Sequence, residues 1–163
     1  MEHESGSAAK RSRAETSTTY SYRKDPTVPF FSDQHPIIVY DGLCALCSGW
    51  VSIVLRYDHR RRFRLVPAQA PLGQALYRHY GLDPENFESN MLIEEGEVWL
   101  KSEACLRMAA GLGSFWPILG WSRILPLRWR DRAYDHLARR RLRFGRRKTC
   151  FLGNEDQRDR FLV

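Results

Sequence analysis

Apolar residues follow two different periods along the chain, and these periods separate predicted strands from predicted helices. Residues 37–40 (IIVY) form a continuous apolar run rich in β-branched side chains, which is typical of a strand buried on both faces. Residues 62–67 (RFRLVP) alternate arginines with apolar side chains and predict a second strand. Residues 90–100 (NMLIEEGEVWL) predict a β-hairpin, with Glu95 and Gly96 as its two-residue turn.

Helical spacing appears between and after these strands. The first predicted helix follows residue 44, and its apolar stripe is formed by Leu46, Trp50, Ile53, Val54 and Tyr57. The second ends at the capping residue Gly81, and its stripe is formed by Leu72, Ala75, Leu76, His79 and Tyr80. The third has Ser102 as its N-cap, and its stripe is formed by Cys105, Met108, Ala109 and Leu112.

The resulting order, β-α-β-α-β-β-α, indicates an α/β fold built on a four-stranded mixed sheet. A helix joins the first two strands, which should therefore be parallel with a right-handed crossover, whereas the hairpin adds antiparallel strands. We assign this domain to residues 34–112. Residues 1–33 are rich in Ser, Thr and charged side chains, and we predict a disordered N-terminal tail because they bury too little apolar surface. Residues 113–163 are predicted to be a helical, Arg-rich C-terminal extension.

The net charge of +7 is concentrated in this extension, where residues 128–148 carry ten Arg or Lys and two Asp. An amphipathic helix is predicted over residues 128–142, with Trp129, Ala133 and Leu137 facing inward. A solvated basic face is the simplest interpretation of the cluster. Peripheral contact with a membrane surface is the functional interpretation, given the neighbouring tryptophans. No pattern of a nucleic-acid-binding fold accompanies the charge, and we expect no nucleic-acid partner.

The chain shows no sign of export or membrane insertion. No apolar run approaches the roughly 20 residues that a membrane-spanning helix needs. The first residues, MEHESGSAAK, lack the apolar core of a secretory signal. Four cysteines in 163 residues do not resemble a secreted disulfide scaffold. We therefore expect a cytoplasmic location, where a CxxC motif indicates redox or metal chemistry.

Two of the cysteines, Cys44 and Cys47, stand one helical turn apart just after the first strand. Asp41 and Gly42 break that strand, so Cys44 should lie at the N-terminus of the first helix. Free N–H groups and the helix dipole stabilise a thiolate at such a position. Cys47 should be more deeply buried and able to form a disulfide with Cys44. Active sites of open α/β sheets favour this end of the strands, so the placement favours dithiol/disulfide chemistry.

Zinc binding and simple packing are the competing interpretations of the pair. Structural zinc takes four ligands, and the chain has a single CxxC. Cys105 lies on the apolar stripe of its helix, where a buried core thiol is expected. We therefore predict no metal and no other cofactor.

Two further residues have open roles. Asp41 could exchange a proton with Cys47, or it could form the turn by accepting hydrogen bonds from N–H groups, and these roles are compatible. Cys150 follows Arg146, Arg147 and Lys148, whose charges would lower its pKa and make it a third redox thiol. A packed cysteine without a function is the alternative. A C-terminal segment folded over the CxxC would favour the redox role.

Several motifs together resemble one family. They are YDGLCALC, VPAQ, SEACLRMAAGLG and RDRAYDHLARRRLRFGRRKTC, and the match runs from about Ile37 to Cys150. This combination resembles the DCC family of thiol-disulfide oxidoreductases. The resemblance implies a thioredoxin-like fold, with Asp41, Cys44 and Cys47 as the Asp-x-x-Cys-x-x-Cys motif. Thioredoxins place a cis-proline before the strand that faces the CxxC, whereas residues 88–91 here read ESNM.

We therefore predict a thiol-disulfide oxidoreductase in which Cys44 attacks a disulfide and Cys47 displaces the reduced product. Its expected partners are a disulfide-containing protein or small thiol, and a cellular thiol reductant. The alternative is a non-enzymatic binding module. In that case the basic C-terminal helix would contact a partner or a membrane surface, and the cysteines would be structural or bind zinc.

Overall fold

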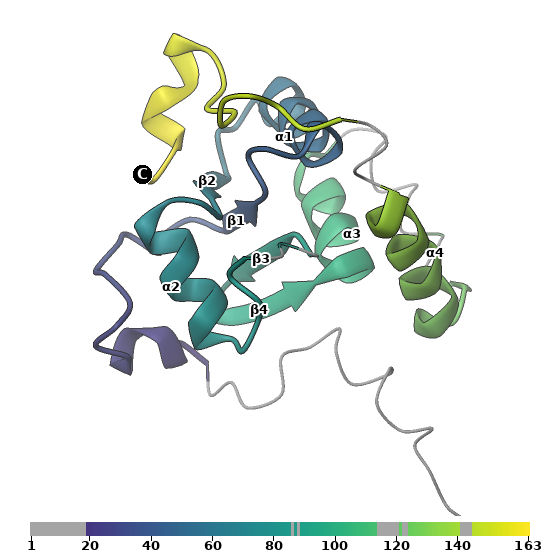
Figure 1. Cartoon of the computed structure of the whole chain (residues 1–163), viewed down its shortest axis with the longest axis horizontal. Coiled ribbons are helices and arrows are strands. Elements are labelled where there is room, and N and C mark those ends of the chain that lie inside the picture. The colour runs from purple at the N-terminus through teal and green to yellow at the C-terminus, as the bar shows by residue number, and fades with distance from the viewer. Residues whose placement is uncertain (1–18, 86, 88, 114–120, 122–123, 141–144) are drawn as a thin grey trace, which may run out of the picture.

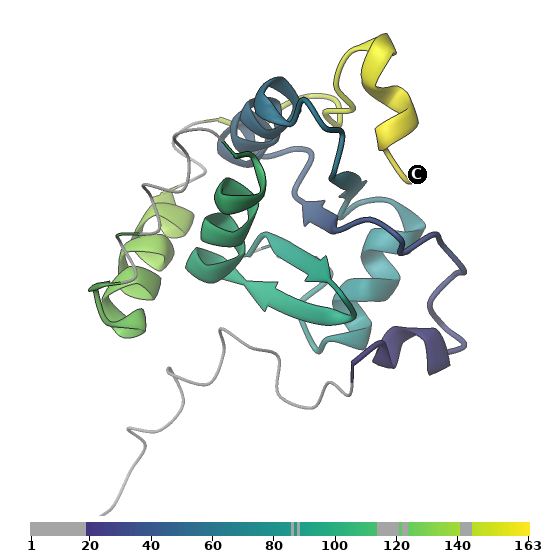
Figure 2. The same cartoon turned by 180° about the vertical axis from the view of Figure 1, so that it is seen from behind.

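The computed structural model of the chain describes residues 19–85, 87, 89–113, 121, 124–140 and 145–163. Its elements, in chain order, are η1 (a 3₁₀ helix, Ser21–Lys24), β1 (Ile37–Tyr40), α1 (Ala45–Tyr57), β2 (Arg64–Pro67), α2 (Pro71–His79), β3 (Met91–Glu94), β4 (Glu97–Leu100), α3 (Lys101–Gly111), α4 (Leu127–Arg140) and η4 (a 3₁₀ helix, Glu155–Arg160). Figures 1 and 2 show α2 on one face of the sheet and α1 and α3 on the other.

The four strands form one open sheet in the order β2-β1-β3-β4. β1 and β2 are parallel, and Ile37 lies opposite Arg64. β1 and β3 are antiparallel, and so are β3 and β4. The predicted α/β fold with a four-stranded mixed sheet is confirmed, and the arrangement is consistent with a thioredoxin-like fold.

The central strand β1 is buried on both faces, as its continuous apolar sequence predicts. All four of its residues are 0% exposed. Successive side chains of a strand point to opposite faces. Accordingly, Ile37 and Val39 pack in the cluster that includes residues of α2, whereas Ile38 and Tyr40 pack with residues of α1 and α3. β1 therefore holds both layers together, and its carboxyl end leads directly to the CxxC.

The predicted hairpin turn is also confirmed. Glu95 and Gly96 both have positive φ angles, 51° and 76°, as a two-residue turn of this hand requires. The Tyr20 main-chain N–H donates a hydrogen bond to the Gly96 carbonyl at 3.0 Å. A Cβ atom on Gly96 would lie 2.6 Å from Tyr20, so this close approach admits only glycine.

Residues 19–33 pack against the sheet domain, although we predicted disorder throughout residues 1–33. Tyr22 is 3% exposed and belongs to the core cluster on the α2 face. The His79 ring, at the end of α2, joins this segment from both nitrogens: Nε2 lies 2.8 Å from Ser21 Oγ, and Nδ1 lies 2.5 Å from Asp25 Oδ2. The prediction from composition overlooked the apolar surface that the tyrosines of this segment supply.

The inward face of α1 differs in part from the predicted stripe, whereas α3 buries Met108 and Ala109 as predicted. The buried residues of α1 are Ser48, Val51, Val54 and Leu55. Of the predicted stripe, Val54 is buried and Trp50 packs against the core while partly exposed. Ser102 does not cap α3, because the helix already begins at Lys101 and has no side-chain cap. Its hydroxyl instead donates a hydrogen bond to Asp131 Oδ1 of α4. Ser102 therefore contacts α4 instead of capping its own helix.

The predicted orientation of α4 is wrong. Trp129 and Leu137, expected to face inward, are 65% and 44% exposed, and Ala133 is exposed as well. The inner face of α4 is polar because the start of α3 is polar. The contacts between them are Ser102 to Asp131, Lys101 Nζ to Asp135 Oδ1 at 2.7 Å, and Arg130 Nη1 to Glu103 Oε2 at 3.3 Å. In the described ranges, no helix is both long and apolar enough to cross a membrane.

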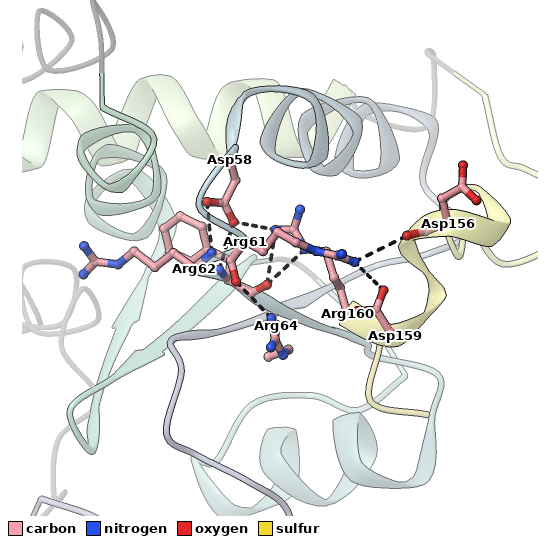
Figure 3. Close-up of polar contacts among 8 residues, drawn as sticks. Asp58, Arg61, Arg62, Arg64, Asp156, Asp159 and Arg160 are labelled. Atoms are coloured by element: carbon pink, nitrogen blue, oxygen red, sulfur yellow. Dashed lines mark hydrogen bonds and ion pairs between the residues drawn. The ribbon is translucent and has the colours of Figure 1, made fainter.

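The end of the chain returns to the sheet and is fixed there by a buried ion pair. Arg160 Nη2 lies 2.5 Å from Asp58 Oδ2, and the two side chains are 3% and 2% exposed. Asp58 also accepts hydrogen bonds from the N–H groups of Arg62 and Phe63, at 3.0 and 2.9 Å. Figure 3 shows these groups converging between the end of α1 and η4.

Main-chain pairing completes this attachment at the outer edge of the sheet. Leu162 N–H donates to the Leu65 carbonyl at 2.8 Å, and Phe161 forms a parallel bridge with Leu65. Phe161 is 7% exposed and packs in the core cluster on the α1 and α3 face. The C-terminus thus covers part of the edge strand β2, which would otherwise offer unpaired main-chain groups.

Replacement of Arg160 should strongly destabilise the fold. Arg160→Ala leaves the Asp58 carboxylate buried without its cation, a change that typically costs about 3–5 kcal/mol. Urea unfolding should therefore show a clearly lower midpoint. Arg158→Ala is the matched control, because Arg158 is exposed on the same 3₁₀ helix. Equal midpoints for the two variants would contradict the importance of this ion pair.

Candidate active site

Cys44 lies where a buried strand gives way to a helix. β1 ends at Tyr40, and Cys44 is the N-cap of α1. Its Sγ accepts a hydrogen bond from the Cys47 main-chain N–H at 3.4 Å. Ser, Thr, Asp and Asn usually cap helices through an oxygen, so a sulfur performs that task here.

Hydrogen bonds to the sulfur lower the pKa of the Cys44 thiol to about 6. The largest cause is a hydrogen bond with the Cys47 side chain, and the main-chain N–H groups of Cys47 and Leu46 add to it. Burial and the negative charge of Asp41 oppose the shift. Because donors stabilise a thiolate more than a thiol, this environment favours the ionised form of Cys44.

Asp41 and Gln69 hold the loop that carries Cys44. Asp41 Oδ1 accepts hydrogen bonds from Leu43 N–H at 3.0 Å and from Gln69 Nε2 at 2.7 Å. Gln69 Oε1 in turn accepts from Gly42 N–H at 3.1 Å. Asp41 therefore has the turn-forming role that we weighed for it, whereas proton exchange with Cys47 stays a prediction.

Sequence reasoning missed Gln69 as a site residue. It follows β2, so its contact with Asp41 comes from the parallel pairing of β1 with β2, which brings both carboxyl ends to one edge. The only signal in the sequence was its place in the VPAQ motif. No local pattern around residue 69 indicates a hydrogen bond to a residue 28 positions away.

The order of burial of the two cysteines is the reverse of our expectation. Cys44 is 4% exposed, whereas Cys47 is only partly buried. The C-terminal strap, residues 145–151, pairs with the main chain on both sides of Cys44. Ala45 N–H donates to the Gly145 carbonyl at 3.2 Å, and Arg147 N–H donates to the Leu43 carbonyl at 2.7 Å. Figure 1 shows this yellow-green segment passing the start of α1.

Cys150 belongs to the strap and packs against the turn before Cys44. A Cβ on Gly42 would lie 2.2 Å from Cys150 Sγ, so the contact requires glycine at position 42. The strap does fold over the CxxC, which we expected to favour a redox role. However, burial and the charge of Asp41 raise the pKa of the Cys150 thiol, so the predicted lowering by the nearby basic residues is wrong.

Cys105 lies in α3, outside the loop and the strap that carry Cys44 and Cys150. Burial raises the pKa of its thiol to about 12, which suits an unreactive packed thiol in α3. Among the residues that the structure describes, no group of three or more His, Cys, Asp or Glu side chains is placed to hold a metal ion.

Tyrosine side chains bond main-chain groups of the loop before β3. Tyr134 of α4 accepts a hydrogen bond from Asn90 N–H at 3.1 Å. Tyr77 of α2 donates one to the Ser89 carbonyl at 2.5 Å. The described residues contain no cis peptide bond. Residues 88–91 therefore lack the cis-proline of thioredoxins, and the Asn90 N–H and the Ser89 carbonyl are bonded within the protein.

The protein is an α/β protein with an open mixed sheet and two cysteines at the start of its first helix. Comparison with known proteins identifies its family. The model of the DCC1-like thiol-disulfide oxidoreductase family matches residues 38–147, which is well over half of the chain. The chain belongs to this family.

Two relatives align along most of their length. The uncharacterized protein YuxK of Bacillus subtilis (strain 168) is 31% identical over 134 residues, which cover 80% of this chain and 98% of the relative. The chloroplastic DCC family protein At1g52590 of Arabidopsis thaliana is 31% identical over 148 residues, covering 90% of this chain and 86% of the relative. No solved structure matches the chain.

The pKa of Cys44 should depend on its neighbour Cys47. We expect thiolate ultraviolet absorbance to reveal a group that titrates near pH 6 and is absent from Cys44→Ser. Cys47→Ala removes the strongest donor and should raise this midpoint toward the ordinary value of about 8.5.

Cys47→Ser is the matched control for that shift. It keeps a hydroxyl donor in place of the thiol, so the midpoint should move less than in Cys47→Ala. A Cys44 thiol that titrates at its ordinary value in the unaltered protein would contradict the description of this site.

Proposed function

We propose that this protein exchanges electrons between its Cys44–Cys47 dithiol and the disulfide of a substrate. The observation that carries the proposal is the position of Cys44 as the N-cap of α1, with its pKa lowered to about 6. Membership of the DCC1-like thiol-disulfide oxidoreductase family supports the same class of reaction.

The chemistry follows from this arrangement. The Cys44 thiolate attacks one sulfur of the substrate disulfide, and the other sulfur leaves as a thiolate. Cys47, one helical turn away, then attacks Cys44 and releases the second substrate thiolate. The protein ends with a Cys44–Cys47 disulfide, and two electrons have passed to the substrate. Asp41 accepts the proton of Cys47 before its attack.

The partners in this proposal are thiol compounds. The substrate is a disulfide-containing protein or a small disulfide, and a cellular thiol reductant regenerates the dithiol. A cytoplasmic location, proposed from cysteine usage, supplies such reductants. The name of the Arabidopsis relative places that protein in the chloroplast, so we also consider a reducing compartment of that kind.

Replacement of single cysteines separates their roles. We expect Cys44→Ser to reduce a disulfide-linked peptide at no more than the uncatalysed rate, because the attacking sulfur is missing. Cys47→Ser should accumulate a mixed disulfide with the peptide, visible by mass spectrometry, because the resolving thiol is missing. Thiol-driven peptide reduction is the readout for both.

Cys105→Ser serves as the control for this series. Cys105 is a packed thiol with a raised pKa, so this variant should retain activity. Equal activity of Cys44→Ser and the unaltered protein would overturn the proposed function.

One surface favours a second candidate function, binding to an anionic membrane. Trp121, Ile124 and Trp129 are 75%, 81% and 65% exposed. Exposed arginines lie on α4, the helix that carries Trp129, at positions 128, 132, 139 and 140. Exposed apolar side chains close in the chain to exposed basic ones are typical of segments that bind anionic lipids.

Vesicle sedimentation tests this candidate. The protein should bind phosphatidylglycerol vesicles, release them as salt increases, and bind phosphatidylcholine vesicles weakly. Trp129→Ala should weaken binding several-fold by removing exposed apolar area, whereas Arg56→Ala, an exposed change on α1, should not. Binding that is equal for both lipids or unaffected by Trp129→Ala would exclude membrane contact through this surface.

A further inference from the structure

The strap forms a short antiparallel ladder with the loop that carries Cys44. The hydrogen bonds Ala45 N–H to Gly145 carbonyl and Arg147 N–H to Leu43 carbonyl enclose a bridge between Cys44 and Arg146. Because the two bonds lie outside this pair, Cys44 and Arg146 form a non-hydrogen-bonded pair. The Cα atoms of such pairs are about 4.5 Å apart, and their side chains lie on the same face.

This is also the separation at which a disulfide can form. The Cα atoms of a disulfide are usually about 4.4–6.8 Å apart. A polypeptide that replaced the strap and kept its two hydrogen bonds would place its central residue opposite Cys44. If that residue were a cysteine, its sulfur would lie within bonding range of the nucleophile.

The strap is more exposed at this point than further along the chain. Residues 145–149 are exposed. Beyond them, Phe151 N–H donates to the Gly42 carbonyl at 3.0 Å, and the Phe151 carbonyl accepts a hydrogen bond from Tyr40. The following residues end in the buried Arg160–Asp58 ion pair. The part opposite Cys44 can therefore leave the loop while the C-terminus stays attached.

Access to Cys44 requires such a movement. Cys44 as a whole residue is 4% exposed, although hydrogen bonds to its sulfur favour the thiolate form. A substrate that only approaches the surface cannot reach this sulfur. A substrate that takes over the main-chain pairing can, because it removes the cover and positions its own sulfur in one step.

We propose that the strap is a built-in pseudosubstrate, with Arg146 in the place of a substrate cysteine, and that the natural substrate is an extended polypeptide that displaces it by strand addition. This inference rests on the proposed function and specifies its substrate class. Cys44 attacks the disulfide of the polypeptide and forms a mixed disulfide with one of its cysteines, while the other sulfur of that disulfide leaves as a thiolate. Cys47 then attacks Cys44, forms the Cys44–Cys47 disulfide and releases the polypeptide thiolate.

A cysteine introduced into the strap tests the geometry without turnover. In a Cys47→Ser, Cys150→Ser background, Arg146→Cys should form a disulfide with Cys44 in oxidised glutathione buffer, detected by peptide mass spectrometry. Arg147→Cys in the same background is the control, because neighbouring side chains of a strand point to opposite faces. Equal yields from both positions, or no link from position 146, would overturn the pairing.

A variant with a more open strap tests whether the strap limits access to Cys44. Arg147→Pro removes the N–H that bonds to Leu43, whereas Arg147→Ala removes the same side chain and keeps that N–H. The loss of one hydrogen bond should increase the open population, and with it kcat/KM for a disulfide-linked peptide dimer, about fivefold. Equal kcat/KM values for the two folded variants would overturn the inference, and if Arg147→Pro does not fold, the cross-link alone decides.

A comparison of two disulfide substrates tests the proposed substrate class. The unaltered protein should prefer the peptide dimer to hydroxyethyl disulfide, which has no main chain to pair with Leu43 and Ala45. Equal kcat/KM values for the two compounds would contradict strand addition and leave disulfide exchange standing. The absence of exchange with both, in every variant, would instead contradict the proposed function itself.

Discussion

The candidate active site depends on a sulfur atom at the N-cap of a helix. A capping oxygen would only stabilise α1, whereas Cys44 Sγ turns the free N–H groups of the first turn into stabilisation of a thiolate. This works only if the loop before the helix is fixed. The buried strand β1 supplies one end of that loop, and the hydrogen bonds of Asp41 and Gln69 fix the rest. Asp41 opposes the ionisation of Cys44, but the donors outweigh it.

The same arrangement creates a conflict between reactivity and access. The C-terminus adds to the edge of β2, buries Arg160 against Asp58, and then places the preceding strap over Cys44. In our proposal, a stabilising attachment at one edge of the sheet therefore also covers the site at its end. Stability and access are coupled through one segment that is attached to the sheet after Phe151 and more exposed before it.

The sequence was sufficient where the physical cause is local. The buried run of β1, the positive φ angles at Glu95 and Gly96 and the helix start at Cys44 all follow from residues close together in the chain. It was insufficient where the cause is a distant partner. The face of α4 depends on the polar start of α3, and the role of Gln69 depends on strand pairing. The pairing of Cys44 with the strap involves residues more than 100 positions away.

The central claim is that Cys44 and Cys47 form a working dithiol, and a redox titration tests it most directly. The protein would be equilibrated in thiol buffers of graded potential, alkylated, and the peptide containing both cysteines weighed. We predict one reversible two-electron transition within roughly −120 to −270 mV, the range of CxxC oxidoreductases. A pair that stays reduced across this range, or whose alkylation requires a chelator, would contradict the account.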